Sequence, residues 1–350
     1  MRRSKLMTIT AGLMAGGLVL AACGDDDGDD TAAPEETTES GDDGDAVEAR
    51  MISEVDTGSC EPASEAAPIP DPEGTGDDET TVHVGKFPGW DENEVVFELA
   101  KVALEEQGYT VEVTELDVGA NYTGVSDGEL DIMMDAWLPG THGVQYVDMD
   151  SEDGAQLGDS LEDVGCWFDE GFLTIAVNND SPAQSLAELG EFSDEYGNRI
   201  VGIDPGAGLT RTTREEVIPT YGLDSWDFPE SSGEAMLAEL DSATSAGEDI
   251  VVTLWHPHWA YAAFPIRDLE DPEGTLGGAE RLYNLGRPGF TEDFPNVAQL
   301  MKNLHLTDAQ LLELEDLMVL EYEREDNAQA IADWLEENPE FLDQWRAGEL

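Results

Sequence analysis

Three tryptophans stand at turn-like positions where side chains can surround a ligand. Trp90 follows a glycine and precedes a run of acidic residues, Trp137 precedes a Leu-Pro-Gly turn, and Trp255 ends an apolar run before His-Pro-His. Indole faces attract a quaternary ammonium group, and each favourable face contributes about 0.5–2 kcal/mol. Because such a cation has no N–H group, hydrogen-bond acceptors cannot select it. Tryptophans at these positions can therefore form an aromatic box for a quaternary ammonium.

A second group of residues could bind a carboxylate. Residues 204–208 have the glycine-rich sequence Asp-Pro-Gly-Ala-Gly and lead into a helix expected over residues 209–218. Backbone N–H groups before a helix are free to bind an anion, and the helix dipole is positive there. His142 could donate a further hydrogen bond. A histidine satisfied by its own neighbours in the core is the alternative for His142.

Packing is the plainer interpretation of any tryptophan, because the side chain is large and mostly apolar. We assign the other five to packing: Trp167, Trp226, Trp259, Trp334 and Trp345.

Metal binding and catalysis are weaker alternatives. His256 and His258 flank a proline, but alternate residues of a strand point to opposite faces, and a metal needs further ligands. Glu92, Asp135 and Asp204 lie near the expected cleft and could act as an acid–base pair. With 80 acidic residues in the chain, such proximity is expected by chance. The sequence contains neither a nucleophile elbow nor a Walker loop. We therefore expect no enzyme, no cofactor and no metal. A surface adhesion or scaffold protein, which would lack a deep cleft, is a further alternative.

Alternating strands and helices must position these residues. An α/β fold with mostly parallel sheets follows from this order, and ligands bind outside the carboxyl ends of such strands. The pattern runs twice, which predicts two lobes, with crossings near residues 177–181 and 265–289. The expected strands cover residues 81–87, 109–116, 131–137, 172–177, 199–203 and 249–255, and the main expected helices cover residues 92–107, 209–218, 231–240 and much of 295–350.

The N-terminus has the features of an export signal. Arg2, Arg3 and Lys5 precede an apolar stretch over residues 6–22, which is short for a membrane span. The stretch ends in Leu-Ala-Ala-Cys-Gly, which resembles a bacterial lipobox and predicts cleavage before Cys23 and acylation of its thiol. We expect residues 1–22 to be a signal peptide and residues 23–79 to be a lipidated cysteine followed by a disordered acidic tether. An ordinary signal peptide with an incidental cysteine is the alternative.

The remaining cysteines and the charge are consistent with export. Cys60 and Cys166 form an even pair, so an oxidising compartment favours one disulfide between them. The formal net charge of −65 repels nucleic acid and anionic lipid, and it favours a cationic or zwitterionic ligand over an anion. A saline habitat would explain the same acidity.

Longer motifs resemble one family, the substrate-binding proteins of glycine betaine/proline betaine ABC importers. The resemblance covers most of residues 81–350 and rests on residues 90–92, 128–131, 137–142, 202–208, 255–259, 271–273 and 278–280. In that family three tryptophans surround the trimethylammonium, and the matching positions here are Trp90, Trp137 and Trp255. The carboxylate is bound by a histidine and by backbone N–H groups. These roles correspond here to His142, Gly208 and Leu209.

The resemblance implies the organisation and the function of the whole chain. It predicts a type II, two-lobed binding-protein fold with two crossover strands as a hinge and a helical C-terminus. Lobe 1 would comprise residues 80–177 and 290–350, and lobe 2 residues 178–289. The chain would be a monomer on the outer face of the cell membrane. It would capture glycine betaine, proline betaine, choline or another compatible solute and deliver it to an ABC permease.

Overall fold

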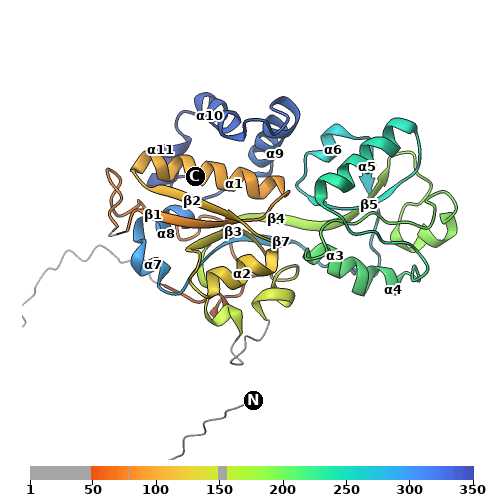
Figure 1. The fold of residues 1–350 in the computed structure, drawn as a ribbon, viewed down its shortest axis with the longest axis horizontal. Coiled ribbons are helices and arrows are strands. Elements are labelled where there is room, and N and C mark those ends of the chain that lie inside the picture. Colours follow the sequence, from red (N-terminus) through yellow and green to blue (C-terminus); the bar gives the residue numbers. More distant parts are fainter. Residues whose placement is uncertain (1–48, 78, 149–155) are drawn as a thin grey trace, which may run out of the picture. The chain divides into compact units, whose positions relative to one another are not determined.

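The computed structural model describes residues 49–77, 79–148 and 156–350 (Figure 1). They belong to one compact unit that spans Asp45–Leu350. The expected signal peptide, Cys23 and residues 24–48 lie outside the described residues. Within the described ranges, no helix is long and apolar enough to cross a membrane.

The sheet of the first lobe combines parallel and antiparallel strands. β1 (Thr81–Lys86) pairs in parallel with β2 (Thr110–Glu115) and with β3 (Ile132–Leu138). β7 (Glu280–Gly286) runs antiparallel to β3 and to the first part of the long strand β4 (Glu162–Asn178). The strand order through both lobes is β2-β1-β3-β7-β4-β5.

The sheet of the second lobe is built around the end of β4. There β4 pairs antiparallel with β5 (Val251–His256) and with β6 (Ile266–Asp268), and a parallel bridge joins Val201 to Val252. The prediction of mostly parallel sheets is therefore wrong. The spacing of apolar residues does not report strand direction, and both lobes use antiparallel pairing.

Helices cover the first sheet and form most of the C-terminal region. α1 begins directly after Trp90 with three acidic residues in its first turn, where the helix dipole favours them, and Gly108 ends it in the left-handed conformation (φ 99°). α1 packs against β3, α9 and α10, and α8 packs against β4. The helices of this lobe are α1 (Asp91–Gln107), α2 (Val118–Ser126), α7 (Phe290–Asp293), α8 (Pro295–Lys302), α9 (Asp308–Asp316), α10 (Asn327–Glu337) and α11 (Phe341–Ala347).

The helices of the second lobe are shorter. α3 (Gly208–Thr212) continues through a π-helical turn into α4 (Ile218–Thr220). α5 (Gly233–Ala246) is capped by the Ser232 side chain, which accepts a hydrogen bond from the backbone of Ala235. α6 (Ala260–Ala263) follows β5. The two-lobed fold predicted from the sequence is confirmed, and Figure 1 shows β4 running from one sheet into the other.

The crossings between the lobes differ from the prediction. Gly171 of β4 pairs with Glu280 of β7, and the next residue, Phe172, pairs with His256 of β5. The first crossing therefore lies within β4, before residues 177–181. The chain returns through residues 269–279, which form no regular strand, so only one of the two crossings is a strand. Because β7 joins the first sheet, lobe 1 begins again near Glu280 and not at residue 290.

Residues 49–77 fold onto the first lobe, so the predicted disordered tether is wrong for this segment. Ile52 and Ile69 are buried, and their backbone N–H groups donate to the carbonyls of Leu161 and Arg346. The side chain of Asn303 also bonds to both backbone groups of Ala67. The segment has few apolar residues, and side-chain hydrogen bonds to its backbone compensate for the scarcity.

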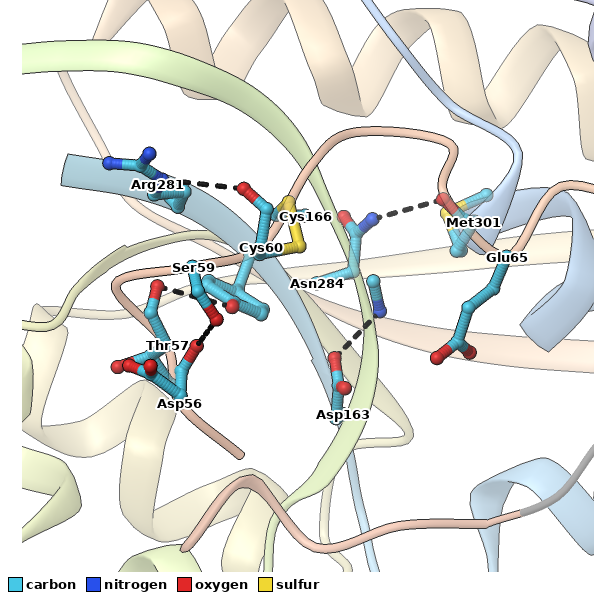
Figure 2. The surroundings of a disulfide bond; sticks show 12 residues. Asp56, Thr57, Ser59, Cys60, Glu65, Asp163, Cys166, Arg281, Asn284 and Met301 are labelled. Carbon is cyan, nitrogen blue, oxygen red and sulfur yellow. Dashed lines mark hydrogen bonds between the residues drawn. A yellow bond between two sulfur atoms is a disulfide. The ribbon is translucent and has the colours of Figure 1, made fainter. Parts of the chain in front are cut away.

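A disulfide between Cys60 and Cys166 fixes this segment to β4 (Figure 2). Arg281 of β7 donates to the carbonyl of Cys60, and the Tyr283 hydroxyl donates to the carbonyl of Thr57. The segment is thus attached to β4, which contains the first crossing, and to β7, which follows the return crossing.

Candidate functional site

One pocket collects every residue that the sequence predicted for the ligand site. The first lobe contributes from the start of α1, the end of β3 and the loop after it, and the second lobe contributes from the start of α3 and from β5. The unfilled space, part of which is open to solvent, is about 280 Å³, which suits a small molecule. The lining residues are Trp90, Glu92, Trp137, Thr141, His142, Leu173, Ile203, Ala207, Gly208, Leu209 and Trp255.

The tryptophans are fixed in the pocket wall by different means. Trp90 is the residue before α1, and its ring stacks on the His142 imidazole with centroids 5.6 Å apart. Trp255 lies in β5, edge-to-face with His258. Trp137 lies near the end of β3 and donates from its indole N–H to Asp135 Oδ1 at 3.0 Å. Each ring is at most 7% exposed, so a ligand among them would be largely removed from water.

Asp135 has an uncommon backbone conformation that serves Trp137. Its φ is 77°, in the left-handed region that most side chains avoid, and the register between β3 and β7 shifts at this residue. The resulting bulge places the Asp135 carboxyl beside the indole N–H of Trp137, which lies two residues later in the sequence. Asp135 is thus a positioning residue for the ring.

His142 is a neutral hydrogen-bond donor at the pocket wall. It is fully buried, and burial lowers its pKa to about 3. Its Nδ1 accepts the backbone N–H of Trp137 at 3.0 Å, so the single proton of the neutral ring lies on Nε2. In the described part of the chain Nε2 has no partner. The geometry therefore supplies an N–H group for an acceptor in the pocket.

Glu280 holds the loop between Trp137 and His142. The backbone N–H groups of Gly140 and Thr141 donate to its carboxylate at 2.9–3.1 Å, and the Thr141 hydroxyl also donates to it. Because Glu280 begins β7, the strand after the return crossing fixes the loop that carries His142.

At Gly208 the two lobes are in close contact. A Cβ atom at this position would lie 2.5 Å from the carbonyl oxygen of Thr141, so only glycine fits. Gly208 and Leu209 open α3, and the first N–H groups of a helix have no carbonyl partner within that helix. Both residues line the pocket from the second lobe, and His142 lines it from the first.

The comparisons with known proteins agree with this geometry. Residues 80–337 match the family model described as the substrate binding domain of ABC-type glycine betaine transport systems. The chain belongs to this family. Among curated proteins it is 32% identical over 170 residues to the glycine betaine/carnitine transport binding protein GbuC of Listeria monocytogenes, a match over 48% of this chain. The matched part spans 54% of that relative's length.

Solved structures of glycine betaine and choline binding proteins share the fold. Lactococcal OpuAC, in its closed conformation complexed with glycine betaine, is 25% identical with a TM-score of 0.68, over 76% of this chain and 99% of that one. A choline binding protein of an ABC transporter, in complex with choline, is 27% identical with a TM-score of 0.68, over 77% of this chain and 92% of that one.

This family member has contacts across the pocket mouth that the sequence did not reveal. The Tyr146 hydroxyl donates to the carbonyl of Gly206 in the other lobe. On the opposite side, the Trp259 indole donates to Asp91 at 2.7 Å, and the Trp259 backbone donates to Glu315 at 2.9 Å. Trp259, assigned to packing from the sequence, is therefore also a bridge between the lobes. Trp259 lies in one of the motifs that carry the family resemblance, but the motif did not indicate contacts that depend on closure.

Buried carboxyls surround the tryptophan end of the pocket. Glu92, Asp135 and Glu315 are each at most 1% exposed, and burial raises the pKa of all three. The sequence interpretation treated Glu92 and Asp135 as chance neighbours of the cleft. Asp204, named with them, is not among the residues that line the pocket.

The two histidines considered for a metal have protein partners. His256 Nε2 lies 2.9 Å from Asp268, and His258 Nδ1 accepts the backbone N–H of Ala260. Across the described ranges, no three metal-binding side chains group together.

Proposed function

We propose that this protein binds a small quaternary-ammonium osmolyte, glycine betaine or a close relative, and delivers it to an ABC importer. The observation that supports the proposal most strongly is the set of groups that line this pocket from both lobes. Three tryptophans line it with a buried carboxyl, and a neutral histidine and backbone N–H groups also face it. That distribution is complementary to a molecule with a trimethylammonium at one end and a carboxylate at the other.

The residues take the roles that the family resemblance assigns. Trp90, Trp137 and Trp255 surround the ammonium group. His142 Nε2 and the N–H groups of Gly208 and Leu209 hold the carboxylate. Because these groups come from both lobes, ligand binding favours the closed state, and the closed form is the one that docks on the permease. The protein performs no chemistry on its ligand.

The lipid anchor belongs to the same proposal. Acylation of Cys23 would hold the protein at the outer face of the membrane, where released ligand passes directly to the permease. Residues 24–48 would then link the anchor to the folded unit. Mass spectrometry of the protein from membranes tests this: a diacylglyceryl modification on Cys23 supports it, and an unmodified, released chain contradicts it.

Isothermal titration calorimetry tests the binding role. The purified chain from residue 23 onward, carrying Cys23→Ser, is titrated with glycine betaine, proline betaine and choline. We expect micromolar affinity together with quenching of tryptophan fluorescence, because the ligand lies against three indoles. Absence of both heat and quenching with all three ligands would reject the proposed ligand class and leave the two-lobed fold unaffected.

Choline is the second candidate. It carries the trimethylammonium but no carboxylate, so it would use the tryptophan end alone, and the buried carboxyl of Glu92 favours it. The ratio of the affinities for glycine betaine and choline decides between the two.

A further inference from the structure

Glu92 is a pocket residue that neither the cage nor the carboxylate-binding groups explain. It lies in the first turn of α1, two residues after Trp90, and it lines the pocket. Its side chain is 1% exposed, and Oε2 has no hydrogen-bond partner in the described part of the chain. A buried carboxyl oxygen without a partner is costly, so its presence at a ligand site points to an interaction with the ligand.

The groups around Glu92 are mostly acidic. Asp91 precedes it on α1 and is paired with Arg324 at 2.7 Å. Asp135 of β3 and Glu315 of α9 are buried, and Coulomb repulsion from Glu92 helps to raise the pKa of each.

The basic groups nearby do not compensate for these acids. His258, which follows β5 beside Trp255, is neutral because burial lowers its pKa to about 4. Arg324 is already paired with Asp91, and His142 is neutral. Within the described residues, therefore, these groups offer Glu92 no counter-charge.

In the closed conformation, burial determines the protonation of Glu92 when the pocket holds no ligand. Loss of hydration, with repulsion from Asp91 as a smaller contribution, raises the pKa of Glu92 to about 8. Below that pH the carboxyl keeps its proton. A quaternary ammonium in the same pocket would be an adjacent positive charge, which favours the ionised carboxylate.

We propose that Glu92 is the counter-charge of the ligand's ammonium group, and that ligand binding is coupled to release of a proton from the Glu92 carboxyl. The inference rests on the proposed function and defines its specificity: the site selects a permanent positive charge in addition to the trimethyl shape. The proton leaves the Glu92 carboxyl for solvent, and the ligand is chemically unchanged. The ammonium nitrogen has no lone pair, so it cannot accept the proton.

The sign of the pH dependence follows from this coupling. The pKa of Glu92 is high in the closed protein without ligand and lower in the complex, so the ionised form binds more tightly. Affinity should rise with pH up to the pKa of the empty state, by at most about tenfold per pH unit for one proton. Above that pH it should become constant.

Calorimetry of the Cys23→Ser chain measures the released proton directly. Choline is titrated at several values between about pH 6 and 9, each in two buffers of different ionisation enthalpy. Choline is used first because it lacks a carboxylate that could alter the protonation of His142. We expect up to one proton to be released per choline at the lower pH values and a matching rise in affinity.

The positive charge is tested with an uncharged ligand of the same shape. In 3,3-dimethylbutan-1-ol a carbon replaces the nitrogen of choline. We expect it to bind at least tenfold more weakly than choline at the upper end of the range, without proton release. Equal affinity of the two compounds would overturn the inference.

Two variants assign the proton to Glu92. Glu92→Gln keeps the size of the side chain, and we expect it to abolish most of the proton release and to lower choline affinity about tenfold at the higher pH. Glu98→Gln is the matched control, because Glu98 is also buried on α1 but does not line the pocket. It should retain the wild-type pH profile. If Glu92→Gln does not fold, the wild-type proton count still decides.

The outcomes separate this inference from the proposed function. Binding of choline or glycine betaine without proton release, unchanged by Glu92→Gln, would overturn the inference and leave the proposed function intact. Absence of binding by all quaternary-ammonium ligands would reject both.

Discussion

The two ends of the pocket are built from different parts of the molecule. At the proposed ammonium end, the pocket wall consists of side chains: Trp137 is held by a hydrogen bond to Asp135, and Glu92 adds a buried carboxyl. At the proposed carboxylate end, most of the proposed donors are backbone N–H groups at Gly208 and Leu209, and they can reach the ligand together with His142 only when the lobes are close. We therefore expect ligand binding at the first end to depend on which side chains are present, and ligand binding at the second end to depend on closure of the lobes.

His142 connects the two ends. Its ring stacks on Trp90, and its Nδ1 accepts from the backbone of Trp137. Its Nε2, which has no partner among the described residues, is the proposed donor to the ligand carboxylate. A comparison of glycine betaine with choline separates the ends, because both ligands have a trimethylammonium but only glycine betaine has a carboxylate. Variants of the ammonium end should affect both ligands, and variants of the carboxylate end should affect glycine betaine more.

The largest effect is expected at the ammonium end. Trp137→Ala removes one wall of the cage and should lower the affinity for both ligands about a hundredfold, since a buried aromatic contact with a cation contributes about 2 kcal/mol or more. Calorimetry measures the two affinities. Trp226→Ala is the control, because Trp226 is buried in the second lobe away from the pocket lining. Affinity within about threefold of wild type for Trp137→Ala, a difference of less than 1 kcal/mol, would contradict the cage.

The carboxylate end should discriminate between the ligands. His142→Phe keeps an aromatic ring beside Trp90 but removes the N–H donor. A hydrogen bond to a charged group contributes about 1.5–3 kcal/mol, so glycine betaine should lose at least about tenfold in affinity. Choline should lose only a few-fold, through the unpaired N–H of Trp137. An equal loss for both ligands would show that His142 acts by positioning Trp137 and not by binding the carboxylate.

The sequence predicted the residues whose roles depend on local context. Trp137 and Trp255 occur at or near strand ends, His142 follows the turn after β3, and Gly208 is the first residue of α3. Such positions can be recognised because the residue type and its neighbours define the conformation. The two lobes followed in the same way from the repeated order of strands and helices.

Contacts that form only when segments distant in the sequence come together could not be predicted. Tyr146 and Trp259 make their contacts between the lobes only when the lobes meet, and the motif that contains Trp259 does not indicate this. The protonation of Glu92 is likewise controlled by its burial, which depends on the tertiary fold. The mistaken tether has the same origin, since residues 49–77 are ordered by a disulfide and by side chains such as Asn303.

Closure can be altered at Gly208 while the backbone N–H of this residue, a proposed donor to the ligand carboxylate, is kept. Gly208→Ala places a methyl group against the Thr141 carbonyl of the other lobe, so the closed state should become less favourable. We expect affinity for glycine betaine and choline to fall by a similar factor, about tenfold or more, for a shift of 1.4 kcal/mol or above. Gly206→Ala is the control, because a Cβ there meets its nearest neighbour, the Tyr146 hydroxyl, at an ordinary 3.9 Å.

Small-angle X-ray scattering provides the second measurement for this variant. Wild-type protein should become more compact when ligand is added, and Gly208→Ala should change less at the same ligand concentration. Unchanged affinity in Gly208→Ala would mean that the lobes tolerate a wider spacing than the structure shows.

The smallest effect should come from one hydrogen bond between the lobes. Tyr146→Phe removes the hydroxyl that donates to Gly206 while keeping the ring that stacks on Tyr122. A neutral hydrogen bond contributes about 0.5–1.5 kcal/mol, so both ligands should bind about threefold more weakly. The bond forms only in the closed state, so the loss should appear as faster ligand release with little change in the association rate. A loss confined to glycine betaine would instead place Tyr146 at the carboxylate end. Tyr146 would then act on recognition of the carboxylate and not on closure.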